Sequence, residues 1–185
     1  MHVAVLFARL GPYHVARLRA LSDRCRVTAV ELSGENLNYD WDEISADGLR
    51  RTVLVDRNHR TVAASRLRGR LREVLDQTEP TVVAVPGWWD PGALIAIEWA
   101  CDRGVPVVLM SDSTRHDGPR VWWREAIKRR VVSLCQSGFA AGQRHVRYLR
   151  ELGMPPNRIT TGYDVVENAH FVAGAETARK QTGLR

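Results

Sequence analysis

The sequence predicts an α/β fold with a doubly wound, mostly parallel sheet and helices on both faces, as in a Rossmann-like domain. Short apolar segments rich in β-branched residues alternate with longer amphipathic segments along the chain. The apolar segments are continuous, which is typical of parallel strands buried on both faces. A chain of 185 residues with 44% hydrophobic content suits one such domain, spanning residues 1–185.

Residues 81–113 contain the clearest strand–helix–strand unit. Residues 82–85 are apolar and β-branched, and predict a strand. Asp90 then caps a helix whose first turn holds a proline, and Gly104 ends that helix. Residues 105–110 predict a second strand, parallel to the first. Because parallel sheets bind ligands beyond the carboxyl ends of their strands, the turns after these two strands are candidate site edges.

The remaining segments continue the alternation, with about seven strands in all. From their β-branched residues we expect the other strands at 3–7, 25–32, 51–55, 138–141 and 158–160. From apolar residues three or four apart we expect the other helices after Pro12, over 61–77, 120–135 and 143–152, and near the C-terminus. The polar segment 33–48 follows neither period and predicts irregular structure.

The chain is basic, with a net charge of +6 and a pI near 9.8. This charge permits contact with nucleic acid, an anionic membrane or phosphorylated ligands, and does not choose among them. The arginines are spread along the helices without a dense run, so we do not expect a nucleic-acid-binding domain.

The three cysteines are far apart and contain no CxxC pair, which argues against a disulfide framework. Cys25 and Cys101 lie in apolar segments, where we expect packed thiols. No cluster of His, Cys, Asp and Glu has metal-ligand spacing, so neither a metal nor another cofactor is expected in this chain. The N-terminus opens directly into a strand, and no apolar run approaches the roughly 18 residues of a membrane span, so we expect a cytoplasmic protein.

Two further segments carry candidate functional residues. Residues 11–14 join the first strand to its helix, and the free helix N-terminus there suits an anion or a sugar hydroxyl. His14 in this loop is explained equally well as a structural cap or exposed side chain and as a contact to a ligand. In the segment 120–135, Trp122, Ala126, Ile127, Val131 and Leu134 share one side, and Arg124, Lys128 and Arg129 fall toward the other. Such a helix either lies in a membrane interface or packs on the sheet with solvated charges.

The segment 138–171 reads GFAAGQRHVRYLRELGMPPNRITTGYDVVENAHF. It resembles the end of the N-terminal, acceptor-side domain of GT-B glycosyltransferases of the broad family-4 type. There a short strand leads to a "G…YL…LG.P..RI" pattern and then to a "G.D…N..F"-like entry into the linker helix. With a glycine loop after the first strand and a polar turn after the central one, the resemblance covers nearly the whole chain in order.

This resemblance implies the acceptor-binding half of an enzyme that moves a sugar from a nucleotide-sugar donor to a sugar or lipid-linked acceptor. In that family a second, C-terminal domain binds the donor and carries an E-x7-E carboxylate pair. Glu35 and Glu43 show the same spacing in the wrong half, which we interpret as chance. We therefore expect a nucleotide-sugar to bind only with a C-terminal donor domain, and this chain to be inactive alone.

By position, the resemblance implies that the acceptor contacts Gly11, Pro12, Tyr13, His14, Gly87, Trp88, Trp89, Ser113 and Thr114. The ring of Trp88 or Trp89 would stack on a sugar or lipid face. Asp112 takes a position near the reacting centre and is the catalytic candidate, with a turn or helix cap as the alternative. Lys128 and Arg129 are candidates for contact with phosphate or an anionic membrane surface, or are simply solvated.

A different class of function stays open at this stage. The same alternation of strands and helices suits a noncatalytic ligand-binding or regulatory module on a flavodoxin-like scaffold. A phosphoacceptor module of that kind needs carboxylates at the ends of its first and third strands. The first strand here ends at Ala8 and Arg9 without a carboxylate, which weakens this variant.

Overall fold

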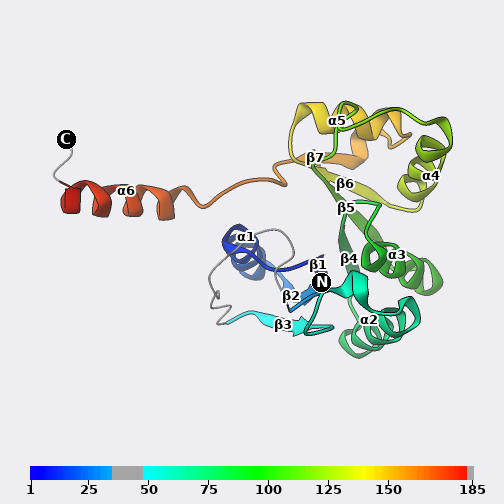
Figure 1. Ribbon diagram of the computed structural model, residues 1–185, viewed down its shortest axis with the longest axis horizontal. Coiled ribbons are helices and arrows are strands. Elements are labelled where there is room, and N and C mark those ends of the chain that lie inside the picture. The colour runs from blue at the N-terminus through cyan, green and yellow to red at the C-terminus, as the bar shows by residue number, and fades with distance from the viewer. Residues whose placement is uncertain (35–47, 183–185) are drawn as a thin grey trace.

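Seven strands form one fully parallel sheet over residues 1–34 and 48–182, the part of the chain that the computed structural model describes (Figure 1). In sequence order they are β1 His2–Phe7, β2 Arg26–Glu31, β3 Arg50–Val53, β4 Val82–Pro86, β5 Val107–Ser111, β6 Ser137–Ala140 and β7 Ile159–Thr161. The spatial order is β3-β2-β1-β4-β5-β6-β7. The predicted α/β class is thereby confirmed. The paired glutamates Glu35 and Glu43 lie outside the described residues.

The strand order places a topological switch point beside β1. Along the chain, β2 and β3 add on one side of β1, and β4 to β7 add on the other. This is the order 3-2-1-4-5 of dinucleotide-binding folds, whereas a flavodoxin-like sheet has the order 2-1-3-4-5. The flavodoxin-like scaffold considered above is therefore not the one this chain adopts.

Helices cover both faces of the sheet, as predicted. The helices are α1 Pro12–Ser22, α2 Ala64–Thr78, α3 Pro91–Arg103, α4 Trp122–Ser133, α5 Gln143–Glu151 and α6 Asn168–Thr182, with short 3-10 turns at His59–Thr61 and Pro156–Arg158. One apolar cluster joins the sheet to α2, α3, α4 and α5, and a second joins the opposite face to α1. Figure 1 shows α1 on the other side of the strands from α2 and α3, and α6 standing apart from the sheet.

The helix ends follow the chemistry of the sequence. Asp90 caps α3, because its Oδ1 accepts a hydrogen bond of 2.8 Å from the Gly92 amide. Gly104 ends the same helix with a φ of +64°, in the left-handed region that glycine adopts at little cost. Both positions were predicted.

One predicted side-chain environment is wrong. Cys101 is exposed on the outer side of α3 rather than packed, whereas Cys135 is buried and its pKa is raised to about 12 by that burial. On α4, Trp122 is 82% exposed and Ile127 is 56% exposed. Only Val131 and Val132 of that helix are buried, because only its last turns reach the core.

Within the described residues, no helix is long and apolar enough to cross a bilayer.

The start of α3 packs tightly against the turn that follows β2. A Cβ added at Gly92 would lie 2.5 Å from Cδ1 and 2.7 Å from Cδ2 of Leu32, whose side chain is fully buried. We expect Gly92→Ala to lower the free energy of unfolding by about 1–3 kcal/mol through this overpacking. Urea unfolding followed by tryptophan fluorescence measures the change.

Gly69 on α2 is the matched control. It is exposed, and a Cβ there meets nothing within 4 Å. Gly69→Ala should raise the free energy of unfolding by about 0.5–1 kcal/mol, because alanine is the better helix former. Equal effects of the two substitutions would contradict the close packing at Gly92.

Candidate functional site

The residues predicted to contact the acceptor, together with Asp112, lie at one edge of the sheet. Residues 11–14 follow β1, residues 87–89 follow β4, and residues 112–114 follow β5. These three strands are neighbours in the sheet and run parallel, so their carboxyl ends meet at the same edge. The three loops therefore lie side by side, and some of their side chains are accessible to a ligand whereas others support the edge.

His14 is held against the end of β1 in an uncharged form. Its ring stacks on Phe7 with the centroids 4.3 Å apart, and its Nδ1 accepts a hydrogen bond of 2.9 Å from the Gly11 amide. Burial, together with the nearby positive charge of Arg17, lowers the His14 pKa to about 4. Since Nδ1 is an acceptor in the neutral ring, the ring proton lies on Nε2. His14 is therefore a structural cap of α1.

Pro12 and Tyr13 line a hollow of about 300 Å³ between α1 and the start of α6. Tyr13 is 38% exposed and stacks on Phe171 of α6 at 6.1 Å between ring centroids. The first loop of the site is thus in contact with the C-terminal helix.

Arg17, which the sequence did not single out, ties α1 to the end of the domain. Its Nη1 donates to the Tyr163 carbonyl at 2.8 Å, and its Nη2 contacts Asp164 Oδ1 at 3.2 Å. Its guanidinium carbon lies 5.2 Å from the centre of the Tyr163 ring. Burial raises the Tyr163 pKa, and the charge of Asp112 acts in the same direction, which places Asp112 near this tyrosine. The position of Arg17 one turn after His14 was the only signal in the sequence.

Asp112 is exposed at the carboxyl end of β5, and it makes no hydrogen bond to the described part of the chain. The turn is held instead by Asp117, whose Oδ2 accepts a hydrogen bond of 2.7 Å from the Thr114 amide. The Ser113 amide donates to Ser111 Oγ at 3.3 Å, and Ser113 and Thr114 are half-buried. Asp112 is therefore a carboxylate without a capping function at the sheet edge.

The two tryptophans after β4 differ in accessibility. Gly87, with a φ of +74°, turns the chain so that Trp88 points inward and Trp89 outward. Trp88 is 8% exposed and meets Tyr148 edge-on at 5.8 Å between ring centroids. Trp89 is 63% exposed, with the guanidinium carbon of Arg60 at 4.3 Å from its ring centre. Trp89 is thus the ring that a ligand can reach.

Three buried polar side chains, Ser33, His59 and Asp90, form a line of hydrogen bonds next to the turn that carries Trp89. Ser33 Oγ and His59 Nδ1 share a hydrogen bond of 2.6 Å, and His59 Nε2 contacts Asp90 Oδ2 at 2.8 Å. Burial alone would raise the Asp90 pKa, but the hydrogen bonds from His59 and the Gly92 amide, with the charges of His59 and Arg60, hold it below its usual value.

These three residue types also make up hydrolase triads, but the Ser33 side chain is fully buried here. No substrate reaches the Ser33 hydroxyl, so the chain Ser33–His59–Asp90 is a scaffold for the edge. His59 lies far from both partners in the sequence, which gave no signal for this contact.

Lys128 and Arg129 have different surroundings on α4. Lys128 Nζ lies 2.8 Å from Glu125 Oε1 and 2.9 Å from the Tyr148 hydroxyl, so its charge is already paired. Arg129 is exposed and has no partner in the described part of the chain. Among residues 1–34 and 48–182, no three His, Cys, Asp or Glu side chains are grouped so that they could hold a metal ion.

A family model described as the glycosyl transferase 4-like domain matches residues 9–162. The chain belongs to this family. The matched range begins at the first loop of the site and ends just after β7, so it includes every strand edge described above. No curated protein matches the sequence.

Solved structures similar to this glycosyl transferase 4-like domain have the GT-B fold. UDP-GlcNAc 2-epimerase from Neisseria meningitidis bound to UDP-GlcNAc aligns with a TM-score of 0.55 and 14% identity, over 87% of this chain and 45% of that one. The S. aureus MnaA–UDP structure aligns with a TM-score of 0.58 and 16% identity, over 86% of this chain and 43% of that one. The apo form of the lipopolysaccharide outer core galactosyltransferase WaaB aligns with a TM-score of 0.56 and 12% identity, over 86% of this chain and 44% of that one.

At these identities the likeness establishes the fold alone. The domain spans less than half the length of each of these three structures.

The environment of His14 makes the stability of the domain depend on pH. The unfolded chain binds a proton at His14 near pH 6.5, whereas the folded domain binds it only near pH 4. The unfolded state therefore binds more protons between these values, and stability is lost as the pH falls from about 6.5 toward 4. Between pH 7 and pH 5 the loss from this residue is about 2 kcal/mol.

His14→Asn removes the titrating group and keeps an acceptor for the Gly11 amide. We expect the variant to lose about 2 kcal/mol less than the unsubstituted domain when the pH of urea unfolding is changed from 7 to 5. All other groups are common to both proteins and cancel in the comparison. The same pH dependence in both would show that His14 is not held uncharged in the fold.

Proposed function

We propose that this chain is the acceptor-binding domain of a glycosyltransferase that moves a sugar from a nucleotide-sugar to a sugar or lipid-linked acceptor. The family match over residues 9–162 is the observation that carries the proposal. The site supports it, because the carboxyl edge of β1, β4 and β5 presents an exposed aromatic ring, an unpaired carboxylate and an uncharged imidazole together. Each of these groups suits a polar carbohydrate.

In this proposal a second domain binds the nucleotide-sugar, and the present chain is inactive without it. Two observations support that division. The chain spans 43–45% of the similar GT-B structures described above. In addition, α6 stands apart from the sheet, with Phe171 48% and Val172 57% exposed, so that it offers an apolar surface to a partner domain (Figure 1).

The described residues suggest a role for each group. Trp89 stacks on the apolar face of the acceptor, steadied by Arg60. The His14 ring holds the first loop in place, and the N-terminus of α1 adds a favourable dipole for negative charge on the acceptor. Asp112 accepts a hydrogen bond from the acceptor hydroxyl and takes its proton as that oxygen bonds to the sugar, while the bond from the sugar to the nucleotide phosphate breaks and the nucleotide leaves on the donor domain.

The role of Asp112 is tested in the enzyme that contains both domains. Asp112→Asn should lower kcat for glycosyl transfer at least 100-fold while leaving the KM for the donor unchanged, because the amide cannot take up a proton. Asp23→Asn is the matched control, since Asp23 is an exposed carboxylate at the far end of α1. It should leave kcat within twofold.

If Asp112→Asn transfers sugar at the unsubstituted rate, Asp112 does not act at the reacting centre. The division of labour has a separate test in the present chain alone. Tight binding of a UDP- or GDP-sugar by this domain, measured by calorimetry, would contradict the assignment of the donor to the second domain.

We also propose that α4 contacts an anionic membrane on the cytoplasmic side. Its outer face carries Trp122, 82% exposed, Trp123, 46% exposed, and Ile127, 56% exposed. Arg124, Arg129 and Arg130 lie on the same helix and are exposed. Exposed aromatic rings beside cationic groups are typical of helices that lie in a membrane interface.

Sedimentation with phosphatidylglycerol vesicles tests this contact. At low salt the domain should pellet with these vesicles and not with phosphatidylcholine vesicles, because the attraction is electrostatic as well as apolar. The double variant Trp122→Ala/Ile127→Ala should stay in the supernatant. Leu94→Ala, which removes an exposed apolar side chain from α3, should pellet as before. Failure of the unsubstituted domain to pellet would remove the proposal.

A further inference from the structure

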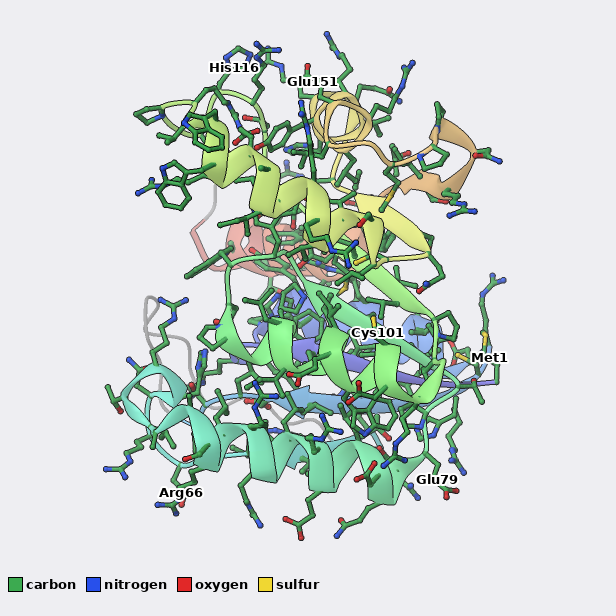
Figure 2. The ribbon with its side chains drawn as sticks, turned by 90° about the vertical axis from the view of Figure 1, so that its right-hand side faces the viewer. Met1, Arg66, Glu79, Cys101, His116 and Glu151 are labelled. Carbon is green, nitrogen blue, oxygen red and sulfur yellow. The ribbon has the colours of Figure 1, made fainter. Side chains whose placement is uncertain are left out.

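A second cavity at the sheet edge lies between the loop after β5 and the outer face of α5. It has a volume of about 390 Å³, in the range of ligand sites, and we call it the arginine pocket. Its walls include Arg115 and His116 from the loop and Arg144, Arg147, Tyr148 and Glu151 from α5. Figure 2 shows His116 and Glu151 at the same end of the molecule. Thr114, one of the candidate acceptor residues, also lines it.

The charges that line the arginine pocket do not cancel. Three guanidinium groups face a single carboxylate, that of Glu151. Glu151 pairs with Arg115 at 3.2 Å. Arg144 and Arg147 are exposed and have no hydrogen-bond or ion-pair partner in the described part of the chain. An anion entering the pocket therefore meets two guanidinium groups without competition from the protein.

The first turn of α5 is arranged against the ordinary preference of a helix. It holds Arg144 and His145 but no acidic residue, and no side chain caps it. Cations near a helix N-terminus are unfavourable, because the helix dipole is positive there. His145 Nδ1 is also buried without a hydrogen-bond partner. An anion bound at this end of α5 would be attracted by Arg144 and by the positive end of the helix dipole, and would offset their mutual repulsion.

The carboxylates beside the arginine pocket are already occupied, and Asp117 accepts hydrogen bonds from the amide and the hydroxyl of Thr114. The Tyr148 hydroxyl receives hydrogen bonds from Arg120 and from Lys128, and it donates to Glu125 Oε2 at 3.0 Å. Glu125 is thus occupied by Arg120, Lys128 and Tyr148. Tyr148 itself is buried, so it forms a rigid partition between Glu125 and the pocket.

We propose that the arginine pocket binds a phosphate group on the acceptor. This inference rests on the proposed function and narrows its substrate to a phosphorylated acceptor, whether a soluble sugar phosphate or a lipid phosphate. Planar guanidinium groups bind phosphate oxygens in pairs, and Arg144 and Arg147 lie one helical turn apart on the same side of α5. Thr114 connects the pocket to the edge where Asp112 lies, so a phosphate held here leaves the rest of the acceptor at that edge.

Calorimetric titration of the whole chain with inorganic pyrophosphate tests the pocket. Unsubstituted protein should bind pyrophosphate and not glucose, and the affinity should fall with added salt. Arg144→Gln/Arg147→Gln should weaken binding at least tenfold. Arg24→Gln removes one positive charge, as each single variant does, from an exposed site between α1 and β2, and should bind within twofold of the unsubstituted protein. The single variants Arg144→Gln and Arg147→Gln should each show part of the loss, which guards against misfolding of the double variant.

Two further ligands identify the source of the phosphate. Tighter binding of glucose 1-phosphate than of geranyl phosphate would indicate a sugar phosphate, and the reverse would indicate a lipid phosphate. Either ligand should lose affinity in the double variant. The proposed phosphate site would be contradicted if the protein did not bind pyrophosphate, or if the double variant bound it as well as Arg24→Gln does.

These results are independent of glycosyl transfer, because no donor takes part in the titration. A failure to bind pyrophosphate would contradict the phosphate site but would not change the result expected of Asp112→Asn in the two-domain enzyme. Conversely, arginine-dependent pyrophosphate binding in an enzyme that transfers no sugar would leave the pocket standing and remove the proposed function.

Discussion

Burial of β1 between two apolar layers is the constraint on which the rest of the structure depends. Ala4 and Leu6 are fully buried toward the helices α2 to α5, and Val3, Val5 and Phe7 pack on the side of α1. A strand buried on both faces has neighbours on both edges, so β2 and β4 must run beside it. The chain reverses its direction of growth there, and this reversal opens the edge that carries the candidate site.

Asp90 shows how the same edge is both built and stabilised. One oxygen caps α3, and the other contacts His59, whose ring also bonds Ser33 at the end of β2. The loops after β2, β3 and β4 are thereby linked through one carboxylate. Trp89 projects outward from this linked base, so its position is set by buried hydrogen bonds and its ring stays available at the surface.

Features set by neighbouring residues in the sequence could be predicted, and those set by distant contacts could not. The strand segments, the Asp90 cap and the Gly104 terminus depend on local chemistry, and all were predicted. The burial of Trp88 depends on Tyr148, and the placement of His59 depends on Ser33 and Asp90. Helical periodicity marked an apolar side of α4, but only the packing of its last turns determines which residues reach the core.

Tyr148 joins parts of the surface that are otherwise separate. Its ring touches Trp88 after β4, its hydroxyl holds Lys128 of α4, and its outer side forms a wall of the arginine pocket. Because one side chain makes all three contacts, α4 and α5 are both tied through it to the turn after β4. A substitution that displaces the Tyr148 ring would therefore disturb three places at once: the packing of Trp88, the pairing of Lys128 and a wall of the arginine pocket.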